Sequence, residues 1–232
     1  MDTPMQPTRL ARTTARNPGD AEPDLTGITL AHRAMVTDVG RVAALTTAFA
    51  DGRRTCAPNQ ARAVARYVAL LCDSIHHHHT TEDQVLWPVI ESVTSNSVDL
   101  TELTEDHAAL DPELDRLREL SAGFRLNFGN AESAAPLAAG LAHLHTLLHE
   151  HIADEEREIF PVIRRYVAAD DWAAVEKAAQ RAGRMSFDGP RTLAVMTDNE
   201  RIRLSENVSP VLIGLIKLLS MRHRRFDRRV FG

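Results

Sequence analysis

Cysteine is scarce in this chain, which has only 2 among its 232 residues. Cys56 and Cys72 do not form the spaced framework of a small secreted domain that is held together by disulfides. This scarcity argues against a disulfide-dependent fold. We therefore expect both thiols to be free and the protein to be cytoplasmic.

Long apolar runs are also missing. No stretch approaches the roughly 18 apolar residues that a membrane-spanning helix needs, so we expect no transmembrane segment. Residues 1–24 carry arginines among Thr, Pro and Gly and lack the apolar core of a signal peptide, so they are predicted to be a disordered N-terminal tail. A net charge of -5 gives no reason to expect nucleic-acid binding.

Aromatic residues make up only 5% of the chain, whereas alanine and leucine are abundant, and this favours an all-α fold. Apolar residues recur at steps of three or four in four stretches, which predicts amphipathic helices. We expect an up-down-up-down four-helix bundle over residues 25–168 and a helical extension over 169–232. The first helix should end near Asp51-Gly52, and the third should continue, kinked, across Pro112.

The most informative pattern is a string that occurs twice, from His78 to Pro88 and from His151 to Pro161. Both copies read His, three residues, two acidic residues, two more residues, then an aliphatic residue, an aromatic residue and Pro. A single histidine precedes each copy: His32 in the first half and His107 in the second. The repeat indicates duplication of a helical hairpin.

The spacing within each copy is typical of a metal site inside a bundle. On a helix, residues i and i+4 point the same way, so His78 and Glu82 share a face, as do His151 and Glu155. These faces are the apolar ones, and a buried carboxylate is costly unless a cation neutralises it. Each imidazole can fix one metal while Glu82 and Glu155 bridge to a second. Nitrogen and carboxylate ligands without thiolate suit iron or manganese, and zinc is a further alternative.

These residues resemble the hemerythrin-like proteins of the HHE cation-binding family. The resemblance covers about residues 25–168 and rests on the histidines, the paired acidic residues, and the Leu-Trp-Pro and Ile-Phe-Pro tails. It implies a four-helix bundle with a non-heme di-iron centre. Carried over, the terminal ligands would be His32, His78, His107 and His151, and the bridges would be Glu82 and Glu155. His79 is either a fifth imidazole or an outer or solvent-facing residue, and a ligand role for Asp111 also stays open.

The third helix departs from the invertebrate oxygen carriers of that superfamily, which place two histidines one turn apart there. Here His107 is followed by Asp111. Fewer histidines and more carboxylates favour the oxidised metal and open coordination positions. We therefore expect two iron ions that bind or react with peroxide, O2 or NO, with catalase-like activity as one form. The alternative is a non-catalytic module that binds or senses iron or oxygen and signals through the C-terminal segment. A structural zinc bundle is a third, weaker hypothesis.

Two further features leave alternatives open. Trp87 and Phe160 either plug the end of the bundle or gate access for small molecules. In the extension we expect a helix over 170–182, a Gly/Pro loop over 183–192 and an apolar-then-basic helix over 208–229. That last helix either covers the bundle or makes a homodimer, or it contacts a membrane surface.

Overall fold

A computed structural model describes residues 13, 15–17, 19–207 and 210–232 of the chain. The tail predicted over 1–24 therefore falls largely outside the described residues. Within its described part, Arg16 donates from its backbone N–H to the carbonyl of Tyr166 at 2.9 Å. The described residues are mostly helical and form no strand, which confirms the all-α prediction.

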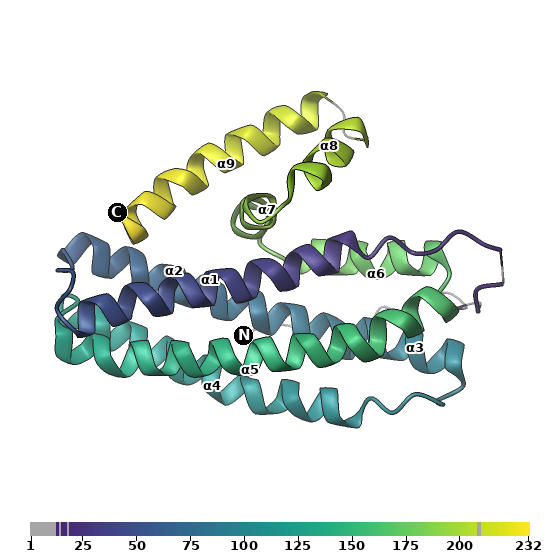
Figure 1. The fold of residues 1–232 in the computed structure, drawn as a ribbon, viewed down its shortest axis with the longest axis horizontal. Coiled ribbons are helices and arrows are strands. Elements are labelled where there is room, and N and C mark those ends of the chain that lie inside the picture. Colours follow the sequence, from purple (N-terminus) through teal and green to yellow (C-terminus); the bar gives the residue numbers. More distant parts are fainter. Residues whose placement is uncertain (1–12, 14, 18, 208–209) are drawn as a thin grey trace.

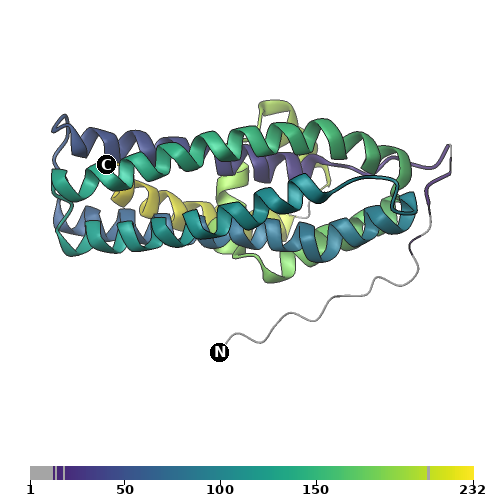
Figure 2. The ribbon, with the colours of Figure 1, turned by 90° about the horizontal axis from the view of Figure 1, so that it is seen from below.

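Four long helices lie side by side along one axis (Figures 1 and 2). They are α1 (Thr26–Ala50), α2 (Pro58–Thr81), α4 (Thr101–Leu126) and α5 (Ala131–Tyr166). Successive helices run in opposite directions, and α1 packs against α5 while α2 packs against α4. The up-down-up-down bundle is confirmed, as are the end of the first helix at Ala50 and the continuity of the third across Pro112.

The connection between α4 and α5 shows how local sequence sets the helix ends. Asn130 caps α5 by accepting a hydrogen bond from the Ser133 N–H at 3.0 Å. Gly129 before it has φ of 74°, and a Cβ atom there would lie 2.6 Å from the Cys56 sulfur. Only glycine therefore fits this turn.

The second helix does not continue regularly after Thr81. Residues Glu82–Leu86 form a π-helical turn, in which the Trp87 N–H reaches the Glu82 carbonyl, and α3 (Trp87–Thr94) follows. Pro88 supplies a physical reason, because it has no N–H and its ring clashes with the carbonyl four residues earlier. The corresponding Pro161 lies inside α5, which continues to Tyr166.

Two hydrophobic clusters fill the bundle, one toward each end. The larger contains residues such as Val39, Val68 and Leu114, and the smaller contains Leu86, Ile90 and Ile163. Along each long helix, the candidate ligands fall between residues of the two clusters. The polar layer is therefore enclosed by apolar side chains on both sides.

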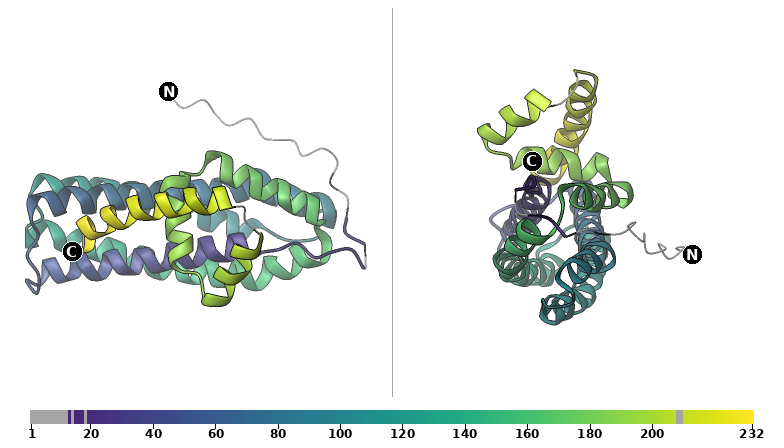
Figure 3. Two further views of the ribbon diagram at one scale, coloured as in Figure 1. Left: turned by 90° about the horizontal axis from the view of Figure 1, so that it is seen from above. Right: turned by 90° about the vertical axis from the view of Figure 1, so that its right-hand side faces the viewer.

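The C-terminal extension lies on one side of the bundle, over α1 and α2 (Figure 3). It comprises α6 (Ala169–Ala182), α7 (Met185–Ala194), α8 (Asp198–Asn207) and α9 (Pro210–Phe231). Two of these confirm the helices expected over 170–182 and 208–229. The Gly/Pro loop expected over 183–192 is wrong, because α7 occupies most of it.

Tertiary packing explains why α7 forms despite Gly189 and Pro190. Phe187 is buried and meets the ring of Tyr67 at 5.4 Å. Arg191, only 3% exposed, donates from Nε to the equally buried Asp38 on α1 at 2.5 Å. These contacts override the weak local propensity of the segment.

The basic end of α9 faces outward, with Arg222, Arg224, Arg225, Arg228 and Arg229 all exposed. The helix packs against α2 and α7, and Asp227 pairs with Arg41 of α1 at 3.0 Å. The side chains of 208–217, the apolar half of the predicted segment, lie outside the described residues. Throughout the described chain, no helix combines the length and the hydropathy of a membrane span.

Replacing Arg191 tests how firmly α7 is fixed to the bundle. Arg191→Ala should lower the free energy of unfolding by about 3 kcal/mol, because it leaves Asp38 buried with one cationic partner fewer. We expect the lower end of the range for a broken buried pair, since Arg41 still contacts Asp38 at 3.1 Å. Urea unfolding measures the change. Arg116→Ala, which removes an exposed pair with Glu113, should have no measurable effect. Equal stabilities of the two variants would contradict the role assigned to Arg191 in fixing α7 to the bundle.

Candidate metal centre

All seven predicted site residues come together in the polar layer between the two hydrophobic clusters. They divide into two groups of potential metal ligands: His32, His78, Glu82 and Glu155 in the first, and His79, His107 and His151 in the second. Within each group the ligand atoms lie within 4.8 Å of one another. All four long helices contribute, as the doubled motif predicts.

The first group joins α1, the end of α2 and α5. The Nε2 atoms of His32 and His78 are 3.0 Å apart. Glu155 brings Oε2 to 3.3 Å from His32 Nε2, and Glu82 brings Oε1 to 2.9 Å from His78 Nε2. Two imidazole nitrogens and two carboxylates thus converge on one point.

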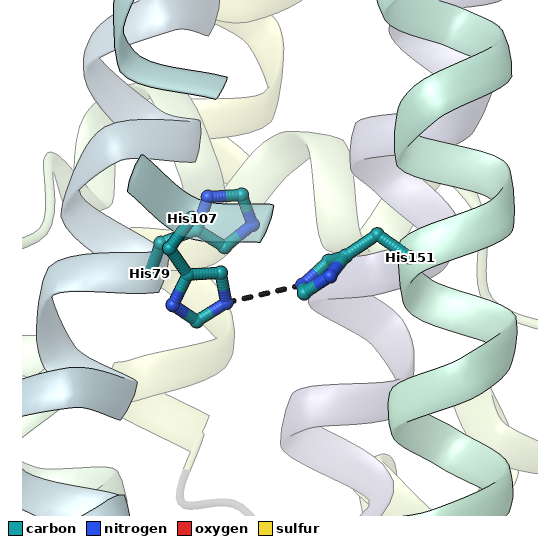
Figure 4. Close-up of side chains that lie close together, drawn as sticks. All are labelled: His79, His107 and His151. Carbon is teal, nitrogen blue, oxygen red and sulfur yellow. Dashed lines mark hydrogen bonds between the residues drawn. The ribbon is translucent and has the colours of Figure 1, made fainter. Parts of the chain in front are cut away.

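The second group consists of imidazoles only, with His79 and His107 facing His151 of α5 (Figure 4). His107 Nε2 lies 3.1 Å from His151 Nε2, the contact drawn as a dashed line. His79 stacks on His107 with ring centroids 4.3 Å apart. Of the two roles left open for His79, the structure places it inside the layer, 4% exposed, rather than in solvent.

Glu82 connects the groups, because its two oxygens face different ways. Oε1 approaches His78 of the first group, whereas Oε2 is 3.7 Å from His107 Nε2 of the second. The π-helical turn begins at this residue. Glu82 therefore presents one carboxylate oxygen to each ligand group.

The charge balance of the layer calls for a cation. Within the described residues, none of the four carboxylate oxygens of Glu82 and Glu155 makes a well-directed hydrogen bond, although imidazole nitrogens lie close to them, and neither ring nitrogen of His79 has a hydrogen-bond partner. Buried polar atoms are normally paired, and a bare buried carboxylate is especially costly. The donor set of imidazoles and carboxylates fits a metal ion such as iron.

The pKa values point the same way. Burial, and then the charge of Glu82, raises the pKa of Glu155 to about 8. Burial lowers the pKa of His78, His79 and His151, so these imidazoles stay neutral with lone pairs free to bind. For His32 burial acts in the same direction, but the charge of Glu155 and contacts with Glu156 and Glu82 raise the pKa to about 10. Without a cation, protons take up part of the negative charge.

A scan against protein-family models matched residues 25–163 to the Hemerythrin HHE cation binding domain. The chain belongs to this family. A search of the curated proteins and a search of the solved structures each found no match. The match spans the bundle, all seven site residues and nothing of α6 to α9, so the cation-binding character of the family concerns the polar layer.

Three carboxylates of this hemerythrin-family domain orient the histidines from outside. Each accepts a hydrogen bond from the outer nitrogen, Nδ1, of one imidazole. Glu156 pairs with His32 at 2.9 Å, Asp83 with His107 at 2.7 Å and Asp106 with His151 at 3.3 Å. Such partners fix the ring so that Nε2 faces the metal. Sequence reasoning gave these residues no role, although each directly adjoins a candidate ligand in the chain.

The aromatic residues of the two motif tails also contact the histidines. Trp87 stacks on His107 and Phe160 on His32, both with ring centroids 6.0 Å apart. Both aromatic side chains are buried in the smaller hydrophobic cluster. They therefore close the polar layer on that side. This agrees with the prediction that they plug the bundle and gives no support to a role in gating access for small molecules.

Asp111 lies apart from both groups. Its side chain is 52% exposed and pairs with His76 Nδ1 at 2.8 Å. The side chain of His76 is likewise more than half exposed, at the surface between α2 and α4. Neither residue is within reach of the candidate ligands.

Removing an outer carboxylate should weaken metal binding without removing a ligand. Asp83→Asn is expected to lower metal affinity about 10- to 100-fold, because a neutral amide oxygen is a weaker acceptor than a carboxylate for the His107 Nδ1–H and holds the ring less firmly. Competition with a coloured chelator measures the affinity. Glu105→Gln removes the same charge from an exposed position on α4 and should change little. If both variants bind metal equally, the proposed orienting role is wrong.

Proposed function

We propose that this hemerythrin-family protein holds two iron ions and binds or reacts with a small oxidant: peroxide, O2 or NO. The observation that carries the proposal is the position of Glu82, with one oxygen toward each ligand group. Iron is favoured over manganese or zinc as a working choice, because imidazole and carboxylate without thiolate suit it.

In this proposal His32 and His78 hold one ion, and His79, His107 and His151 hold the other. Glu82 is shared, and Glu155 completes the first group from the opposite helix. Iron in such a site supplies redox chemistry on small oxygen or nitrogen species. The chain contributes the fixed imidazoles, the outer carboxylates that orient them and the apolar walls that exclude water.

The layer joins five imidazoles to two carboxylates, and the carboxylates favour the oxidised metal. Reaction with peroxide or oxygen, including catalase-like activity, is therefore one form of the proposal. Protons exchanged with solvent during such a reaction would pass along the hydrogen bond between His32 Nδ1 and Glu156. Glu156, which is partly exposed, lies between His32 and the surface.

A non-catalytic sensor is the second candidate, and one contact favours it. Helix α1 carries both His32 of the layer and Asp38, which anchors α7 through Arg191. A shift of α1 on metal or ligand binding would therefore reach the C-terminal extension directly. Such a module would change the packing of the extension and would leave peroxide intact.

Metal analysis and absorption spectroscopy test the metal content. We expect about two irons per chain and absorption bands of an oxo-bridged pair in the near ultraviolet. A colourless protein with a single zinc would rule out both candidates. After peroxide is added, oxygen evolution supports the enzyme, whereas intact peroxide with a ligand-dependent spectral change supports the sensor.

Variants of the two groups should lose metal to different extents. Glu82→Ala removes the shared carboxylate and should abolish binding of both ions, whereas His79→Ala should leave the first group able to hold one. His76→Ala, two helix positions before the motif yet exposed and paired with Asp111, serves as the matched control and should retain both. Full iron content in Glu82→Ala would contradict its assignment as the bridge.

A further inference from the structure

A cavity of about 300 Å³ lies between the bundle and the C-terminal extension. Its bundle wall comes from α1, α2 and the π-helical turn after α2, with Ile28, Ala31 and Leu86 among its residues. The opposite wall comes from α6 and α7 and includes Trp172, Val175 and Ala179. Figure 3 shows how the extension covers this side of the four long helices. The bundle alone would leave this surface open.

The cavity reaches the candidate metal centre at one point. His78 and Glu82 of the first ligand group belong to its lining. The side chain of His78 is 16% exposed, whereas those of His32, Glu82 and Glu155 are exposed by no more than 4%. The first group is therefore open on the His78 side, toward the space that the extension encloses.

The size of the cavity exceeds what a small oxidant needs. Water occupies about 30 Å³ in the liquid, and a diatomic molecule or peroxide is of similar size. The cavity thus has roughly ten times the necessary volume. It falls at the lower end of the range of about 300–1,000 Å³ for pockets that hold small organic molecules.

The charged groups in the wall are already engaged or, for Glu176, have a pKa shifted toward the neutral form. Arg191 is bound by Asp38 and Asp188, and its free nitrogen Nη2 is fully buried. Burial, and then the charge of Asp24, raises the pKa of Glu176. The rest of the wall is dominated by apolar side chains. An anion would find no accessible, unpaired Lys or Arg among the described lining residues.

We propose that this cavity binds a small, uncharged, largely apolar organic molecule, about the size of a substituted benzene ring, next to the first ligand group. The role of that molecule at the metal rests on the proposed function, since iron held by His78 and Glu82 would face it. Its binding depends only on the cavity.

Filling the cavity tests the proposal. Isothermal titration calorimetry of the full-length iron-loaded protein with benzyl alcohol should show one site per chain, and benzoate should bind at least about tenfold more weakly. Ala31→Leu on α1 and Ala179→Leu on α6 each place extra methyl groups in the cavity and should weaken benzyl alcohol binding at least about tenfold. Ala44→Leu and Ala173→Leu make the same change at exposed positions of the same helices and should bind normally.

The outcomes separate the cavity from the metal. Iron content and thermal unfolding are measured for every variant, and two filling variants on different helices guard against misfolding of one. If the protein takes up no iron but still binds benzyl alcohol, and the filling variants weaken that binding, the inference holds and the proposed function is contradicted. Iron uptake without such binding, unchanged binding in the folded filling variants, or tighter binding of benzoate would overturn the inference. Oxidant access through an otherwise empty space would then be the remaining interpretation.

Discussion

The burial of two carboxylates in the middle of the bundle is the constraint on which the rest of this structure depends. Glu82 and Glu155 are almost fully buried, and their oxygens make no well-directed hydrogen bond among the described residues. Such groups are tolerated only where a cation or a proton balances them. The surrounding imidazoles, the outer carboxylates and the two hydrophobic clusters all serve that layer. The stability of the bundle and its capacity to bind metal are thus two consequences of one arrangement.

Much of the bundle and its ligand set could be predicted from the sequence, because both depend on helical spacing. A residue four positions from another shares its face, so the doubled motif identifies inward-facing residues through its spacing alone. The division of the candidate ligands into two groups was harder to predict from the sequence. It depends on His79 turning into the layer, and a tract of consecutive histidines wraps around the helix, so the sequence leaves the direction of that side chain open. The only sequence feature that points to the outer carboxylates is that each directly adjoins a candidate ligand in the chain, which is a weak indication.

The failures of prediction have a common cause. Gly189 and Pro190 indicate a loop by local propensity, yet Phe187 and Arg191 hold the segment in a helix through contacts with residues far away in the chain. The π-helical turn at Glu82 is similar. Pro88 indicates that the helix is interrupted near this position. The helix widens into a π-helical turn rather than ending, because α3 still packs in the smaller hydrophobic cluster. Tertiary contacts decide both cases, and a single sequence does not display them.

The extension matters to the metal layer because both rest on the same two helices. His32 and Asp38 lie on α1, and His78 and Ser74 on α2, with Ser74 accepting a hydrogen bond from Arg191 at 3.2 Å. Helix α7 is thus fixed within two turns of the first ligand group, on the side where His78 is least covered. A bundle of this family could bind its cations without such a cover. Here α6 and α7 cover a space that is lined mainly by apolar side chains and reaches His78 and Glu82. If the layer binds metal as we propose, these two helices would set which molecules approach the first group more than the ligands would.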